Sequence, residues 1–142
     1  MLTKRKVLAY ITKGEAEERE LLVFEHKDIP EAGIQVPGGT IEEDELLIDA
    51  LYREIEEETG ITRNELTLVG KIRKYLFFPE GNHGIHERNI FHLSYIGEEK
   101  SYWEHVVNGG GEDDGLIYCL RWISLQNPPV LAGAQDDALD MI

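Results

Sequence analysis

Acidic residues are concentrated in one short segment of the chain, where their types and spacing could do chemistry. Residues 39–61 contain nine acidic residues and one basic residue, Arg53. This segment therefore has a net charge of −8, more than half of the formal −14 of the whole chain. Carboxylate oxygens are the ligands that hard divalent cations such as Mg²⁺ prefer, and these cations often bridge carboxylates to phosphates. The segment is typical of a metal site that recruits a phosphorylated ligand.

Helical spacing places three of these carboxylates in line with an apolar stripe. At 100° per residue, Glu54, Glu57 and Glu58 continue a face of apolar side chains, namely Leu47, Ile48, Ala50, Leu51 and Ile55. Carboxylates at i, i+3 and i+4 repel one another, and a core-facing position is costly unless positive charge neutralises them. A Glu-rich helix is more commonly a solvated face, and we keep that interpretation for Asp49 and Glu56.

The segment from Gly39 to Ile61 resembles the Nudix box, Gly-x5-Glu-x7-Arg-Glu-U-x-Glu-Glu-x-Gly-U, in which U is aliphatic. The matching residues are Gly39, Glu45, Arg53, Glu54, Ile55, Glu57, Glu58, Gly60 and Ile61. This resemblance implies a hydrolase for a nucleoside diphosphate linked to another moiety, in which water attacks a phosphorus of the diphosphate. A non-catalytic Nudix-fold domain that senses a nucleotide is the alternative.

The resemblance also implies roles for individual residues. Glu54, Glu57 and Glu58 are the expected ligands of Mg²⁺ or Mn²⁺, and the backbone carbonyl of Gly39 is expected to add another oxygen. Arg53 is expected to hold the carboxylates in place. Bound ions would lower the pKa of a water molecule and stabilise charge on the leaving phosphate.

The general base is left open by the sequence, because members of the family differ here. A glutamate of the box, Glu54 or Glu45, is one source of the base. Glu112 is another, because it lies in the glycine-rich and acidic segment 108–115, which precedes an expected strand. The alternative for Glu112 is a solvated, mobile linker.

Two arginines outside the box are candidates for substrate binding. Arg73 and Arg88 are cations in an acidic chain, and a guanidinium can hold a distal phosphate through paired hydrogen bonds. Charge pairing on the surface of a strand is the commoner explanation for such residues.

The remaining pattern predicts a single domain, residues 1–142, of the α/β class. Strands are expected at 7–12, 20–26, 34–36, 66–78, 89–96 and 116–125, with one helix at 44–59 and a short final helix at 134–141. Gly60 is the expected left-handed terminator of the first helix. With the Nudix resemblance, the expected fold is an α/β/α sandwich around a mixed β-sheet.

Composition excludes several classes of function. The chain has 142 residues, of which 28 are acidic and 14 are basic, and this excess repels phosphate backbones and disfavours an extended nucleic-acid surface. No apolar run approaches the roughly 18 residues of a membrane span, and a single cysteine excludes a disulfide framework. We therefore expect a cytoplasmic protein with a small nucleotide-type substrate. The oligomeric state is left open, and a homodimer is compatible with the sequence.

Overall fold

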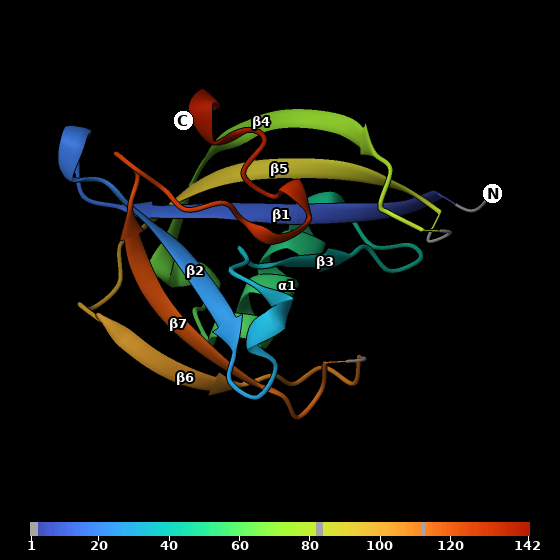
Figure 1. The fold of residues 1–142 in the computed structure, drawn as a ribbon, viewed down its shortest axis with the longest axis horizontal. Coiled ribbons are helices and arrows are strands. Elements are labelled where there is room, and N and C mark those ends of the chain that lie inside the picture. Colours follow the sequence, from blue (N-terminus) through green and yellow to red (C-terminus); the bar gives the residue numbers. More distant parts are fainter. Residues whose placement is uncertain (1–2, 82–83, 112) are drawn as a thin grey trace.

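The chain folds around a mixed β-sheet, as a computed structural model shows for residues 3–81, 84–111 and 113–142. The strands are β1 (Thr3–Lys13), β2 (Glu20–His26), β3 (Gly38–Thr40), β4 (Leu66–Phe77), β5 (Ile85–Tyr95), β6 (Tyr102–Val106) and β7 (Ile117–Ser124). The strand order is β4-β5-β1-β2-β7-β6, and β3 pairs with β1 beside this path (Figure 1). β1 and β5 are parallel, whereas the other pairs are antiparallel. The expected mixed sheet is confirmed.

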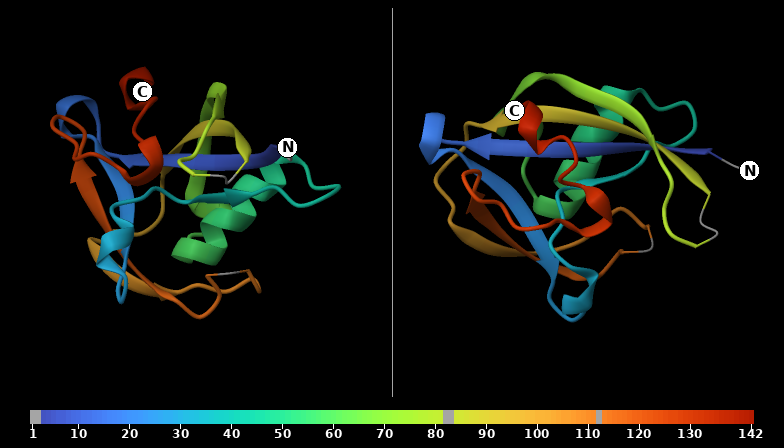
Figure 2. Two further views of the ribbon diagram at one scale, coloured as in Figure 1. Left: turned by 45° about the vertical axis from the view of Figure 1, so that its right-hand side comes forward. Right: turned by 45° about the horizontal axis from the view of Figure 1, so that its top comes forward.

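The sheet opens between β1 and β2, and this opening positions the rest of the site. The two strands pair at Thr12–Leu21 and Lys13–Glu20, close to the end of β1. Earlier residues of β1, Lys6 to Leu8, pair with β3 instead. β1 and β2 therefore diverge, and the helix α1 (Leu47–Thr59) lies behind the opening (Figures 1 and 2).

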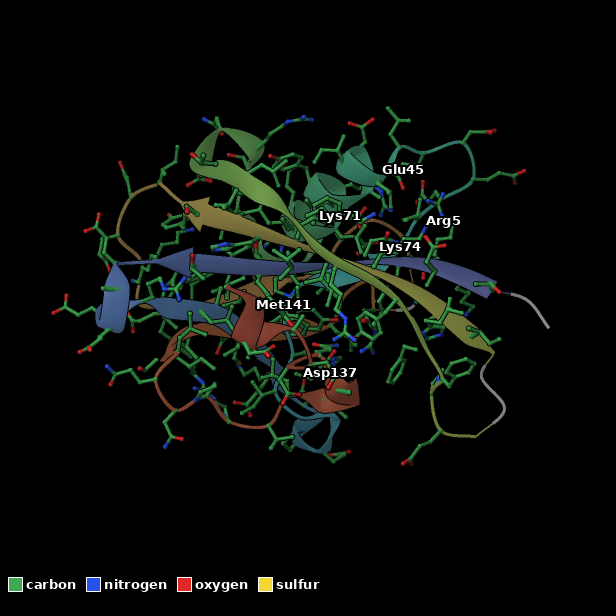
Figure 3. The ribbon with its side chains drawn as sticks, turned by 90° about the horizontal axis from the view of Figure 1, so that it is seen from above. Arg5, Glu45, Lys71, Lys74, Asp137 and Met141 are labelled. Carbon is green, nitrogen blue, oxygen red and sulfur yellow. The ribbon has the colours of Figure 1, made fainter. Side chains whose placement is uncertain are left out.

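Alternation along β1 supplies a hydrophobic core to each face of the sheet. Val7, Ala9 and Ile11 pack toward the face that α1 covers, and Leu8 and Tyr10 pack toward the face that the C-terminal segment covers. Figure 3 shows these two layers, with Glu45 on the α1 side of the sheet and the C-terminal segment on the other. The expected layering is confirmed, although the C-terminal layer is not a regular helix.

The helix ends where the sequence predicts but begins three residues later. Gly60 has φ 80°, and its N–H donates to the Glu56 carbonyl, as expected for a left-handed terminator. Asp44, the expected first residue, has φ 64°, which lies in the left-handed region and is incompatible with the first turn of a helix. Leu46 is the N-cap, so the predicted start at Asp44 is wrong.

The predicted helix at 134–141 is also wrong, because a tertiary contact takes its hydrogen-bonding groups. The segment forms two 3₁₀ turns, Ala132–Ala134 and Leu139–Met141. The hydroxyl of Tyr10, which is fully buried, donates to the Gln135 carbonyl and accepts from the Ala138 N–H. A regular helix would use both of these backbone groups internally.

Among the described residues, no helix combines the length and the apolar character needed to cross a membrane.

Tyr10→Phe tests how strongly this contact fixes the C-terminal layer. The substitution keeps the ring but leaves the Gln135 carbonyl and the Ala138 N–H without their partner, so we expect a loss of about 1–3 kcal/mol in the free energy of unfolding. Chemical denaturation measures this loss. Tyr52→Phe, on α1, is the matched control: it makes the same chemical change and keeps the ring that contacts Arg63. Equal stability of Tyr10→Phe and wild type would contradict the assigned contact.

The same hydroxyl predicts a pH dependence of stability. Burial raises the pKa of Tyr10 from 10.0 to about 12. Because the folded-state value is above the unfolded value, the neutral hydroxyl stabilises the fold below pH 10, and this stability is lost as the pH rises toward about 12. The difference in unfolding free energy between wild type and Tyr10→Phe should therefore shrink over this window. If the difference in unfolding free energy stays constant between pH 10 and about 12, the predicted titration of Tyr10 is wrong.

Candidate active site

A cavity of about 480 Å³ lies where α1 faces β3. Three carboxylates of α1, Glu54, Glu57 and Glu58, line it together with Gly38 and Gly39 of β3. Lys4, Lys6 and part of the loop after β6 complete the wall. The structure thus brings the three predicted acidic residues and Gly39 into one cavity, and Asp49 and Glu56 are exposed on the other side of the helix as expected.

Burial destabilises the charged forms of two of these acids. Glu58 is 8% exposed, and its Oε1 accepts a hydrogen bond of 2.8 Å from the Gly38 N–H. Burial raises the pKa of Glu58 well above its usual value, although the Gly38 hydrogen bond opposes this shift. Burial also raises the pKa of Glu54 to about 7, against the lowering effect of the Arg53 guanidinium. Both acids would be stabilised as carboxylates by further positive charge in the cavity.

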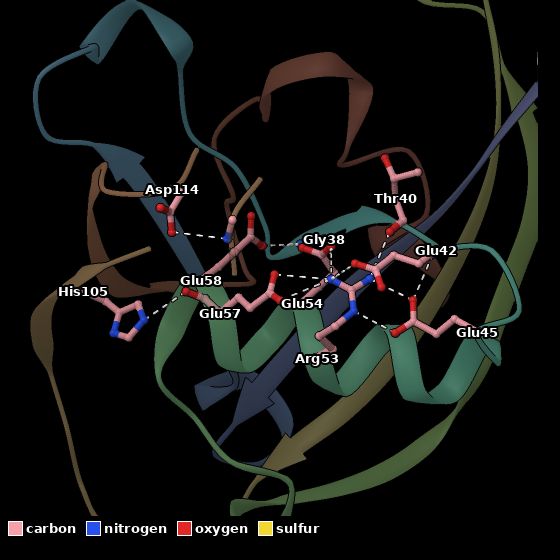
Figure 4. A network of polar contacts seen from close by, with 11 residues as sticks. Gly38, Thr40, Glu42, Glu45, Arg53, Glu54, Glu57, Glu58, His105 and Asp114 are labelled. Carbon is pink, nitrogen blue, oxygen red and sulfur yellow. Dashed lines mark hydrogen bonds and ion pairs between the residues drawn. The ribbon is translucent and has the colours of Figure 1, made fainter. Parts of the chain in front are cut away.

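Arg53 connects the acids of the helix to the loop before it (Figure 4). Its Nε and Nη2 donate to the two oxygens of Glu45, at 2.7 and 2.9 Å. Its Nη1 lies 2.9 Å from Glu54 and 3.3 Å from Glu57, and Nη2 also donates to the Thr40 carbonyl. The paired, charge-assisted contact with Glu45 lowers the pKa of that carboxyl group. The contacts of Nη1 fix the orientation of the Glu54 and Glu57 side chains.

Two glycines leave room for these carboxylates. A Cβ atom on Gly39 would lie 2.3 Å from Cδ of Glu54, and one on Gly109 would lie 2.4 Å from Cδ of Glu57. Gly109 also has φ 118°, which L side chains rarely adopt. A side chain at either position would displace a carboxylate from the cavity.

The strand β6, which the sequence did not reveal, holds the end of the helix. Nε1 of Trp103 donates to the Thr59 carbonyl at 2.9 Å, and Nε2 of His105 lies 3.0 Å from the Glu57 carbonyl. These contacts reach carbonyls of the last turn, which have no partner within the helix. β6 therefore fixes the turn that carries Glu57 and Glu58.

The loop between β6 and β7 brings two described acids, Asp113 and Asp114, to the wall of the cavity. Asp113 lines the cavity, and its Oδ2 accepts a hydrogen bond of 2.6 Å from the Tyr118 hydroxyl. Glu112, the predicted loop acid, lies outside the described residues. The sequence predicted an acid of this loop but did not single out Asp113, for which the acidic run 112–114 was the available signal.

A second cavity of about 270 Å³ adjoins the first, and both are lined by Lys6, Gly38, Gly39, Glu58 and Asp113. Arg88 lines this second cavity. Arg73 lines neither cavity and is exposed on β4, where its guanidinium stacks on Tyr75. The structure therefore separates the two arginines that the sequence grouped together.

The donor set of the first cavity fits a hard divalent cation, although the described residues hold no ready-made metal cluster. No three acidic, histidine or cysteine side chains among them converge as a metal site. The reason is local, since Arg53 contacts Glu54 and Glu57 while Glu58 turns to the Gly38 N–H. Most of the side-chain oxygens that line the cavity belong to carboxylates, which suit Mg²⁺ and Mn²⁺.

Comparisons with known proteins agree with this geometry. Residues 2–140 match the family model of the NUDIX domain. An RNA pyrophosphohydrolase of Thioalkalivibrio sulfidiphilus is 37% identical over 108 residues, which are 76% of this chain and 58% of that protein. One of Bartonella tribocorum is 41% identical over 63 residues, 44% of this chain and 36% of the relative. The chain thus spans less than two thirds of the length of these curated relatives.

Solved structures support the fold. A MutT NUDIX hydrolase of Burkholderia pseudomallei matches with a TM-score of 0.69 at 21% identity, and the match covers 100% of this chain and 99% of that hydrolase. The dihydroneopterin triphosphate pyrophosphohydrolase of E. coli has a TM-score of 0.69 at 19% identity, with 99% and 96% covered. With the family model matching nearly the whole sequence, this chain belongs to the NUDIX domain family.

Proposed function

We propose that this protein hydrolyses a phosphoanhydride bond in a nucleotide-type diphosphate, with the help of Mg²⁺ or Mn²⁺. One observation carries the proposal: Glu54, Glu57 and Glu58 face one cavity from one side of α1, and burial raises the pKa of Glu54 and Glu58. Such a cluster opposes its own ionisation unless a cation neutralises it. A cation bound there in turn attracts an anionic substrate that a chain of net charge −14 would otherwise repel.

The proposed ligands are the carboxylates of Glu54, Glu57 and Glu58 and the backbone carbonyl of Gly39. When bound, the ion would act as a Lewis acid on the phosphates and would make a water molecule more acidic. Arg53 would keep Glu54 and Glu57 in place, because its Nη1 contacts both. Lys4 and Lys6, at the wall of the cavity, would add positive charge near the phosphates of the substrate.

The hydrogen bonds around the cavity bear on which acid would act as the general base. Both oxygens of Glu45 accept from Arg53, and this contact lowers the pKa of Glu45, so Glu45 is a poor acceptor of a proton. Glu54 and an acid of the loop after β6 stay as candidates, and Glu54 would serve as the base only if its carboxylate does not hold the ion. In that loop Asp113 lines the cavity, and Glu112 stays a prediction from the sequence.

The nature of the substrate rests on the relatives. Both curated relatives are named RNA pyrophosphohydrolase, so we include RNA with a 5′ triphosphate among the candidate substrates. Nucleotide sugars, dinucleotides and nucleoside triphosphates complete the panel. A nucleotide-sensing domain without catalysis, the alternative function, would be stabilised by one of these ligands without turnover.

Glu58→Gln tests the proposed metal site on α1. Because the amide cannot carry the charge of the carboxylate, we expect hydrolysis of the preferred member of the panel to fall by at least about 100-fold. Wild type should also gain thermal stability when Mg²⁺ is added, and Glu58→Gln should lose most of that gain, because a ligand that binds the folded form stabilises it by mass action. Glu56→Gln, on the exposed side of α1, is the matched control. Unchanged activity in Glu58→Gln would overturn the site.

Arg53→Lys tests the orienting role of the guanidinium. Lysine keeps the charge but loses the planar fork that contacts both oxygens of Glu45. We expect the apparent affinity for Mg²⁺ to fall by about 10- to 100-fold, as for loss of a group that orients ligands. Titration of activity with Mg²⁺ measures this change, with Arg63→Lys, an exposed pair with Asp49, as the control. Matching Mg²⁺ titrations of Arg53→Lys and wild type would refute the role.

A further inference from the structure

We propose that the second cavity is an anion subsite in which Arg88 binds a phosphate group of the substrate beyond the bond that is cleaved. This inference rests on the proposed function, since the two cavities share Lys6, Gly39 and Glu58 along their walls and a polyphosphate can span both. It assigns the substrate to a class: molecules with at least three linked phosphates, in preference to diphosphates capped by a neutral group.

Arg88 is a buried cation whose charge has no carboxylate partner among the described residues. Arg88 is 6% exposed, and none of the ion pairs between described residues includes it. Its contacts are with neutral groups: Nη1 donates to the Tyr75 hydroxyl at 3.3 Å, and the guanidinium lies 3.6 Å from the centre of the Phe77 ring. Burying a charge without a counter-charge is costly, so such an arginine is typical of a binding site.

The acid that precedes Arg88 on β5 and the two acids that line the second cavity have other partners. Glu87 precedes Arg88 on β5 and therefore points to the opposite face of the sheet, where it contacts Arg5 and Lys74. Two acids line the second cavity, but Glu58 accepts from the Gly38 N–H and Asp113 accepts from the Tyr118 hydroxyl. The charge of Arg88 is thus left for a ligand.

One further cation, Lys6, and a histidine, His86, line the same cavity. The parallel register of β1 and β5 places Lys6 opposite Arg88 and Lys4 opposite His86, and Lys6, His86 and Arg88 all line the second cavity. A guanidinium presents paired N–H donors that match the oxygens of a phosphate. The stack on Phe77 holds the plane of this fork, so little freedom is lost when an anion binds. Phosphate is therefore the group that the cavity fits.

Arg88→Gln, compared on two substrates, tests the subsite. The pair consists of a nucleoside triphosphate and the nucleoside diphosphate sugar with the same base. We expect Arg88→Gln to lose about 10- to 100-fold in kcat/KM on the triphosphate, the range for a charge-assisted hydrogen bond, and less than about threefold on the sugar. Arg73→Gln is the matched control, because that arginine also stacks on an aromatic ring of β4 but is exposed and lines neither cavity. Equal losses on both substrates would overturn the subsite.

A binding measurement without metal separates this inference from the proposed function. In EDTA, millimolar inorganic triphosphate should raise the melting temperature of wild type and of Arg73→Gln but not that of Arg88→Gln. Arg88→Lys, which keeps the charge but not the fork, should give an intermediate shift. Without ligand, Arg88→Gln should melt at or above the wild-type temperature, since a buried unpaired charge is removed, whereas a purely structural role predicts a lower one. If wild type hydrolyses neither substrate but these shifts are found, the proposed function fails and the subsite stands.

Discussion

Mutual repulsion among Glu54, Glu57 and Glu58 is the constraint on which the rest of the site depends. Carboxylates three and four residues apart on one helical face lie close together, and burial of Glu54 and Glu58 strengthens the conflict. The fold answers it from several directions: Arg53 donates to two of the three, the Gly38 N–H donates to Glu58, and the glycine at 39 lets the strand approach Glu54. The contacts of Gly38 and Gly39 come from β3, which β1 fixes independently of the helix, whereas Arg53 belongs to the helix itself.

That independence comes from the way the sheet is divided. β1 pairs with β2 near one end and with β3 over Lys6 to Leu8, so the glycine-rich strand is held by the sheet and not by the helix that it serves. At the other end, Trp103 and His105 of β6 donate to carbonyls of the last helical turn. Two distant parts of the sheet thus hold the helix, which allows an acidic face to remain inside the protein. A helix held only by its own apolar contacts could rotate its carboxylates into solvent.

Local patterns predicted the parts of this arrangement that depend on neighbouring residues in the chain. The buried face of α1 and its end at Gly60 follow from periodicity and from the terminating glycine, and both are confirmed. The start at Asp44 was wrong because a single left-handed residue interrupts an otherwise helical pattern. The final helix was wrong because Tyr10, more than 120 residues away, takes the backbone groups at Gln135 and Ala138. β6 was not predicted, since its short stretch mixes polar and aromatic residues and its pairing with β7 is set by register.

The same limit explains why Arg73 and Arg88 could not be told apart by sequence. Both are cations in strands, and both stack on an aromatic ring of β4. What separates them is the position of each strand: β5 lies between β4 and β1, so Arg88 has a neighbour on each side, whereas Arg73 is on the edge strand. The order of the strands therefore decides the environment of each arginine: Arg88, on an inner strand, is buried, and Arg73, on the edge strand, is exposed to solvent. Arg88 lies beside the cavity of the three α1 carboxylates, and the two cavities share Lys6, Glu58 and Asp113. This arrangement suits the proposed ligand, whose phosphates would contact a bound metal ion in the first cavity and Arg88 in the second.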